Sequence, residues 1–168
     1  MKKKLIMYDL APQMKVYDRL GQVWKPFIMY ISRPNFKSEV INLDKFGLRF
    51  NDFNNNNNLE ISKNNSIFNE KIFSDKKETA VLLGGSSALG VGASSDASTI
   101  SSLLSKQTNT HFFNLGCSAF SGFQEIVLFQ SMINYLTKIK KIVIFSGLND
   151  IFFSHHISTY DPTLGPFY

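Results

Sequence analysis

A serine, a glycine and an asparagine each follow a short apolar segment of this 168-residue sequence. A serine hydroxyl such as that of Ser86 can attack an acyl carbon. The backbone N–H groups of Ser86 and Gly116, together with the Asn149 side-chain amide, can stabilise the oxyanion that such an attack creates. Glycine suits the middle position because it has no Cβ to block a close approach. These residue types therefore predict acyl-transfer chemistry, provided that the fold brings them together.

Three apolar runs must position these residues. We predict strands at 79–83, 111–115 and 142–146, because each run is short and lies next to glycine or turn residues. We expect helices between them, at 97–107 and 122–136. Strands and helices that alternate in this way predict right-handed crossovers and a parallel sheet, at whose carboxyl edge the three following loops converge.

Apolar spacing also predicts which faces of these elements are buried. The run at 142–146 is apolar on both faces, so we predict that it lies centrally in the sheet. The residues expected to form the apolar stripes of the two helices are Ile100, Leu103 and Leu104 in the first, and Ile126, Val127, Phe129, Gln130, Ile133 and Leu136 in the second.

The part before the first strand divides into two segments. Residues 1–50 form an N-terminal extension, in which 10–24 either forms an amphipathic helix or, as we prefer, packs its aromatic side chains on the main domain. A hairpin is predicted at 40–50 around Gly47, with Arg49 on the surface. Residues 51–75 are an Asn-rich linker or loop, with five consecutive asparagines at 54–58. The main domain is expected at 76–168.

Composition and spacing exclude several classes of protein. The net charge of +5 is spread thinly, so no nucleic-acid partner is expected. A phosphate-binding P-loop needs a Gly-Lys-Ser/Thr step, but no lysine stands between Lys77 and Lys106. The glycines at 84, 85, 90 and 92 also lack the dinucleotide-binding spacing. We therefore expect neither a cofactor nor a metal.

The start of the chain and its cysteine content bear on location. Cys117 is the only cysteine, so no intramolecular disulfide can form, and we expect a small buried thiol. The apolar run at 5–8 is too short for the core of a signal peptide, and no run is long enough to span a membrane. A cytoplasmic protein is expected.

Three segments together resemble the SGNH (GDSL) hydrolase family. The stretch 84–90, Gly-Gly-Ser-Ser-Ala-Leu-Gly, resembles the first block of that family, with Ser86 as the nucleophile. Asn114-Leu115-Gly116 resembles the second block, and Gly147-Leu148-Asn149-Asp150 resembles the third. The resemblance implies that Gly116 and Asn149 donate to the oxyanion and that the fold is a three-layer α/β/α arrangement around a flavodoxin-like parallel sheet. An upstream segment, Asn42-x-Asp44-x-x-Gly47-x-Arg49, is similar to one that precedes the first block in some members.

The sequence departs from the family pattern in two places. Gly85 stands where the first block usually has aspartate, which is not the triad acid. The fourth block, an Asp-x-x-His that supplies the base, is absent. We reject His111 as a substitute because it starts the second strand, at the edge opposite Ser86. His155 and His156 are interpreted as the solvated end of a helix.

The missing block leads to a structural expectation and leaves two functions open. With no strand after the third, that strand becomes a sheet edge with apolar faces. We therefore expect either a piece of a longer hydrolase, incomplete at its C-terminus, or a homo-oligomer or other partner that covers the edge. The first function is a serine ester hydrolase or acyltransferase acting on a small acyl ester or acylated carbohydrate. The alternative is a non-catalytic binding or regulatory protein for a carbohydrate or acyl ligand.

Overall fold

A three-stranded parallel sheet organises the protein in a computed structural model, which describes residues 7–51, 66–68, 78–136 and 138–157. Its strands are β3 (Glu78–Gly84), β4 (Thr110–Asn114) and β5 (Ile139–Phe145), in the spatial order β4-β3-β5. The helices that connect and follow them are α5 (Ser86–Leu89), α6 (Ile100–Thr108), α7 (Gly122–Ser131) and α8 (Leu148–His156), with 3-10 turns at Asp96–Ser98 and Ile133–Tyr135. The chain therefore has an α/β fold, as the alternating pattern predicts.

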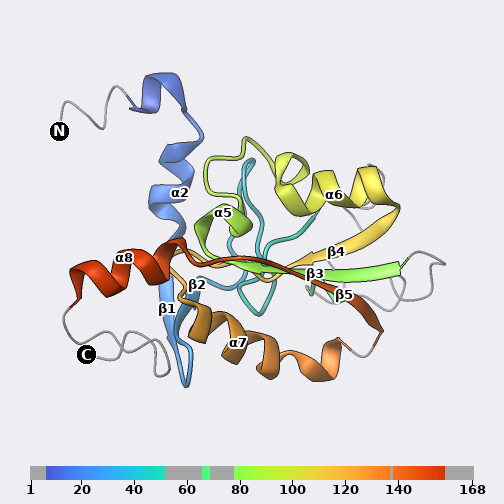
Figure 1. Ribbon diagram of the computed structural model, residues 1–168. Coiled ribbons are helices and arrows are strands. Elements are labelled where there is room, and N and C mark those ends of the chain that lie inside the picture. Colours follow the sequence, from blue (N-terminus) through green and yellow to red (C-terminus); the bar gives the residue numbers. More distant parts are fainter. Residues whose placement is uncertain (1–6, 52–65, 69–77, 137, 158–168) are drawn as a thin grey trace.

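Helices cover both faces of this sheet. Figure 1 shows α6 over one face and α7 over the other. The two faces of β3 divide accordingly: Val81 packs in a cluster with Leu128 of α7, whereas Leu82 packs in a second cluster with Leu104 of α6. A strand buried on both faces needs an almost continuous apolar run, and β3 has one.

The central strand is β3, and the prediction that the third strand lies centrally is wrong for the described sheet. In this part of the chain β5 pairs with β3 alone. Its outer side chains are exposed, with Ile142, Ile144 and Phe145 at 51%, 68% and 52%. An apolar run shows that both faces of a strand can be covered, but it does not show that they are.

The apolar stripes predicted for the two helices are buried only in part. Leu104, Val127 and Phe129 pack against the core and Leu136 is buried, but other predicted positions are exposed. On α6 the buried residues are Ser101, Ser102 and Ser105, while Leu103 is 46% exposed. On α7, Leu128 is buried and Ile126 is 57% exposed. Serine side chains are small, and they form hydrogen bonds to the neighbouring strand: the Phe112 N–H donates to Ser105 Oγ at 3.0 Å. This polar contact lies on the face of α6 that meets the sheet.

The N-terminal segment contributes a helix, a hairpin and part of the core. Its elements are α2 (Met14–Leu20), β1 (Gln22–Lys25) and β2 (Met29–Ser32), and the two strands pair antiparallel. Ile28 and Ile31 lie in the same cluster as Val81 of β3. The aromatic side chains differ in burial: Tyr17 is buried, whereas Trp24 on β1 and Phe27 in the turn of the hairpin are 73% and 86% exposed. Packing of the N-terminal aromatics is therefore confirmed only in part.

The turn predicted around Gly47 is present, but it forms a single bridge between Leu43 and Arg49 rather than two strands. Gly47 has a φ of +81°, and the Asp44 carboxylate accepts the Phe46 and Leu48 N–H groups at 2.8 and 2.9 Å. The surface position predicted for Arg49 is wrong, because this residue is fully buried. Most of the predicted Asn-rich linker lies outside the described residues.

Candidate functional site

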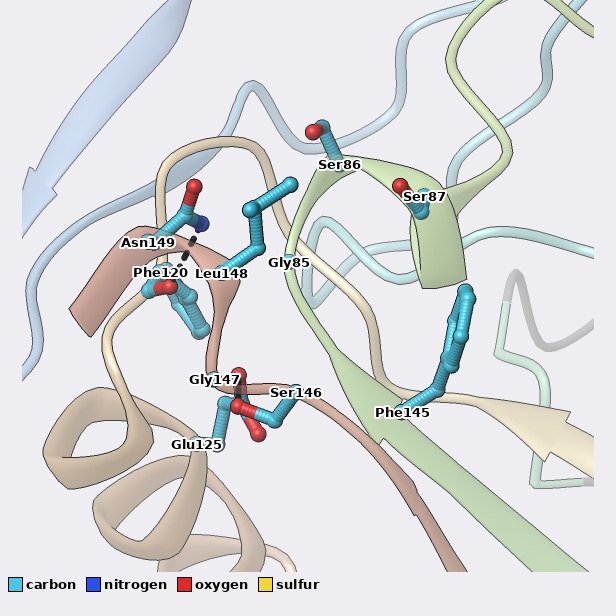
Figure 2. Close-up of a pocket in the computed structure, with 10 residues that line it drawn as sticks. All are labelled: Gly85, Ser86, Ser87, Phe120, Glu125, Phe145, Ser146, Gly147, Leu148 and Asn149. Atoms are coloured by element: carbon cyan, nitrogen blue, oxygen red, sulfur yellow. Dashed lines mark hydrogen bonds between the residues drawn. The ribbon is translucent and has the colours of Figure 1, made fainter. Parts of the chain in front are cut away.

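A pocket of about 210 Å³ opens at the carboxyl edge of the sheet, where β3 and β5 end. Figure 2 shows the residues around it. They are Gly85, Ser86, Ser87, Phe120, Glu125, Phe145, Ser146, Gly147, Leu148 and Asn149. The convergence of the first and third loops, expected from a parallel sheet, is therefore present.

Ser86 is the first residue of α5, on a tight turn that leaves β3. The turn depends on Gly84, which has a φ of +153° and lies so close to β5 that a Cβ would come within 2.3 Å of the Phe145 carbonyl oxygen. The Ser86 side chain is partly exposed to the pocket. Within the described residues, no hydrogen bond holds its hydroxyl.

Asn149 lies in the first turn of α8, the helix that follows β5. Its side chain approaches the Gly84–Ser86 turn that leaves β3. Its Nδ2 donates to the Phe120 carbonyl oxygen at 2.7 Å (Figure 2). A Cβ on Gly85 would stand 2.6 Å from that nitrogen. The amide of Asn149 therefore lies directly over the residue before Ser86, and glycine at position 85 makes this approach possible. Among the described residues, no second acceptor bonds the other hydrogen of this amide nitrogen.

Gly116 does not line the pocket, in contrast to the oxyanion role that the sequence predicted for it. It is buried beneath α5, where a Cβ would come within 2.3 Å of the Leu89 nitrogen. Its N–H donates to Asn114 Oδ1 at 2.9 Å, while Asn114 Nδ2 donates to the Ala88 carbonyl at 2.9 Å. Asn114 thus joins the second loop to α5, and Gly116 allows the two to pack closely.

Glu125 is a pocket residue that the sequence analysis did not single out. It is almost fully buried on α7, and its Oε1 accepts a hydrogen bond from Ser146 Oγ at 2.6 Å. Burial, with a smaller contribution from the charge of Asp150, raises the pKa of Glu125 to about 7, although the Ser146 hydrogen bond opposes this change. Figure 2 shows Glu125 and Ser146 at the end of the view away from Ser86. A carboxyl among apolar helix positions has no local sequence signal, so only the fold reveals it.

Asp150, the last residue of the third segment, has a structural role. Both of its carboxylate oxygens accept the N–H of Gly122, at 3.1 and 3.0 Å. Gly122 is the first residue of α7, so this carboxylate satisfies an N-terminal donor of the helix and complements its dipole. Asn149 and Asp150 together fasten α8 to the loop and helix opposite.

The described histidines lie away from Ser86. His111 is buried on β4 in register with Thr79, near the opposite end of β3 from Gly84. His156, at the end of α8, has Nδ1 at 2.9 Å from the Phe152 carbonyl and stacks on the Phe152 ring. His155 is exposed in the same last turn. None of the three shares a described hydrogen bond with Ser86.

Three further observations concern metal ligands, membrane-spanning helices and the cysteine. Among the residues that the structure describes, no three His, Cys, Asp or Glu side chains are grouped closely enough to hold a metal ion. No helix in the same part of the chain is long and apolar enough to cross a membrane. Cys117 is buried, as predicted, and burial raises the pKa of its thiol.

Two comparisons with known proteins were negative. No protein-family model matches the chain, and a search of curated proteins finds no match.

Proposed function

We propose that this protein is an SGNH/GDSL-type serine ester hydrolase or acyltransferase, with a three-layer α/β/α fold of that type and Ser86 as the nucleophile. One observation carries the proposal: the Ser86 turn and the Asn149 amide, 63 residues apart in the sequence, meet at one pocket. A hydroxyl beside an amide donor is what acyl transfer needs.

The chemical roles follow from the donors that face the pocket. Ser86 Oγ attacks the acyl carbon and gives its proton to solvent water, and the carbonyl oxygen of the ester becomes an oxyanion. When the oxyanion collapses, the ester C–O bond breaks and the alcohol leaves with a proton from solvent; water or another alcohol then takes the acyl group from Ser86. The Ser86 N–H and the second hydrogen on Asn149 Nδ2 stabilise this charge. The Phe120 carbonyl orients the Asn149 amide through its other hydrogen. Gly116 has no part in this scheme, because its N–H is already bonded to Asn114.

A second candidate function is favoured by the surroundings of the Ser86 hydroxyl. No imidazole or carboxylate in the described parts of the chain shares a hydrogen bond with it, and a serine without a base is a weak nucleophile. The same pocket presents hydroxyl groups, a carboxyl and the half-exposed Phe145 ring. Such a lining suits a non-catalytic protein that binds a carbohydrate or an acyl compound.

A fluorophosphonate probe with mass spectrometry distinguishes these functions. For the hydrolase we expect one adduct on the wild-type protein, mapped to Ser86, and none on Ser86→Ala. Ser154→Ala is the matched control, because Ser154 is exposed on α8 and outside the pocket lining. Labelling that persists in Ser86→Ala and disappears in Ser87→Ala would assign the nucleophile to the neighbouring residue and contradict the proposal.

The binding function has its own readout. An unlabelled wild-type protein whose Asn149 side-chain amide resonance shifts on addition of an acylated sugar would support the second candidate. Ester turnover by the wild-type protein that Ser86→Ala abolishes would exclude it.

A further inference from the structure

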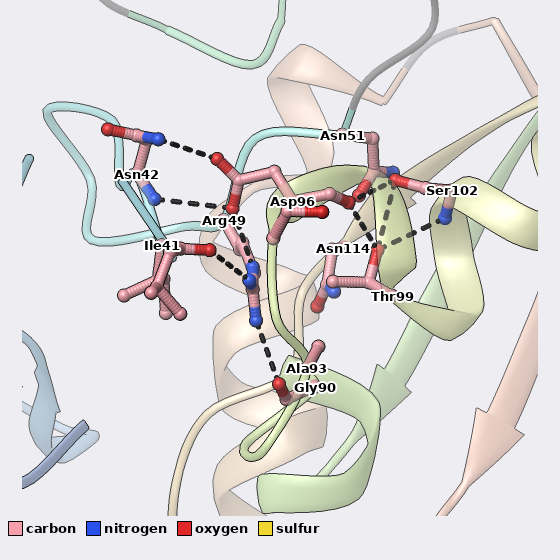
Figure 3. A network of polar contacts seen from close by, with 12 residues as sticks. Ile41, Asn42, Arg49, Asn51, Gly90, Ala93, Asp96, Thr99, Ser102 and Asn114 are labelled. Atoms are coloured by element: carbon pink, nitrogen blue, oxygen red, sulfur yellow. Dashed lines mark hydrogen bonds and ion pairs between the residues drawn. The ribbon is translucent and has the colours of Figure 1, made fainter. Parts of the chain in front are cut away.

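Arg49 is the largest fully buried side chain in the described structure, and all three of its nitrogens are bonded. Figure 3 shows the network around it. Nε donates to Asp96 Oδ1 at 2.8 Å, and Nη2 donates to the Val40 carbonyl at 2.9 Å. Nη1 donates to the carbonyls of Leu89 and Gly90, at 3.1 and 2.9 Å. A buried guanidinium is tolerated only with such complete pairing.

Two of these acceptors belong to the end of α5, the short helix that begins with Ser86. The Gly90 and Val91 N–H groups both donate to the Ser86 carbonyl at 3.0 Å, and the Leu89 N–H donates to the Gly85 carbonyl at 3.0 Å. One end of this single turn therefore bonds Arg49, and the other end carries the Ser86 hydroxyl. A cation at the carbonyl end of a helix is also favourable.

Asp96 anchors the guanidinium to a second part of the chain. Its Oδ2 accepts from Asn42 Nδ2 at 2.7 Å, and its Oδ1 accepts from the Asn42 N–H at 3.2 Å as well as from Arg49. Asn42, Asp44, Gly47 and Arg49 thus form one structural unit. Asp44 and Gly47 make the turn, while Asn42 and Arg49 hold Asp96.

We propose that Arg49 is a positioning residue for Ser86: with Asp96 it fixes α5 against the segment 40–49 and so sets the direction of the Ser86 hydroxyl. The part of the proposal that concerns reactivity depends on the proposed function, since it takes Ser86 as the nucleophile. The part that concerns the conformation of α5 stands on the hydrogen bonds alone.

Amide hydrogen exchange tests the conformational part. Lysine at position 49 keeps the charge, but a single ammonium group cannot reach Asp96, Val40 and Gly90 together. For Arg49→Lys we expect the Leu89, Gly90 and Val91 amides to exchange at least about tenfold faster, while the Glu125 amide of α7 changes less than about twofold. Arg33→Lys is the control, because Arg33 is exposed, lies over the Phe36 ring, and within the described residues its guanidinium donates to the Arg19 carbonyl alone.

Equal acceleration at α5 and α7 would overturn the proposal, because it would show a general loss of stability. If Arg49→Lys does not fold, Asp96→Asn tests the conformational role instead, because asparagine keeps the shape and one acceptor oxygen of the original side chain. It should accelerate exchange at Gly90 more than at Glu125, and unchanged exchange at Gly90 would refute the role of the network.

Fluorophosphonate labelling tests the part that concerns reactivity. In Arg49→Lys we expect the maximal rate of Ser86 labelling to fall about tenfold, with the concentration of probe for half-maximal rate changed less than about twofold. An unchanged maximal rate would contradict positioning. A wild-type protein that takes no label would refute the proposed function, and the exchange experiment would still decide the conformational role.

Discussion

Glu125→Gln should stabilise the protein at high pH and leave it nearly unchanged at low pH. The Glu125 carboxyl is buried on α7, and its pKa lies at about 7 rather than at its ordinary 4.5. Glutamine has nearly the same shape and keeps an oxygen to accept the hydrogen bond from Ser146. The substitution therefore removes the ionisation and preserves the packing.

The size of the effect follows from the two pKa values. Below pH 4.5 the carboxyl is protonated in the folded and unfolded states, so it adds no pH dependence. Between pH 4.5 and 7 the unfolded chain loses this proton first, so the free energy of unfolding falls as the pH rises. At about 1.4 kcal/mol per pH unit, the ionised carboxylate costs the fold about 3 kcal/mol above pH 7. Glu125→Gln avoids this cost.

Urea denaturation followed by circular dichroism at pH 4.5, 6, 7 and 8 measures the difference between variant and wild type. We expect it to grow from near zero to about 3 kcal/mol. Glu39→Gln is the control, since Glu39 is exposed and its substitution should give no comparable growth. A difference that stays constant from pH 4.5 to pH 8 would show that Glu125 ionises as freely in the folded state as in the unfolded chain, and the argument from burial would fail.

Two further substitutions test contacts around the pocket. Gly116→Ala places a Cβ 2.3 Å from the Leu89 nitrogen, so we expect a loss of about 2 kcal/mol or more in urea denaturation; an unchanged stability would show that α5 is free to move away. Asp150→Ala removes the carboxylate that accepts the Gly122 N–H, and it should cost about 1 kcal/mol, most of which Asp150→Asn should recover; equal losses in both variants would contradict a capping role.

The order of strands and helices could be predicted from the sequence because it depends on local patterns. Apolar runs that are followed by glycine located β3 and β5 to within a few residues, and Ser121 caps α7 directly before its predicted start at Gly122. The meeting of Ser86 and Asn149 then followed from one topological rule, namely that parallel strands end at the same edge.

The contacts that could not be predicted are those between distant segments. Nothing near Arg49 in the sequence announces that Asp96 and the carbonyls of α5 will surround it, so a surface position was expected. The partner of the Gly116 N–H could not be predicted for a related reason: Asn114, two residues earlier, accepts it and holds the loop under α5. Residue type and spacing indicated a donor, but the partner of that donor depends on tertiary structure.

The apolar cluster that the N-terminal segment forms with α5 bears on the order in which the molecule can fold. Val16, Leu20, Ile41 and Leu43 bury their side chains in one cluster with Leu89, so the N-terminal segment gains this contact only after β3 and α5 exist. During synthesis these apolar side chains emerge first, and Leu89 follows only after 46 to 73 further residues. Contacts of such sequence separation slow folding, because the entropy of closing the intervening loop is lost before any burial is gained.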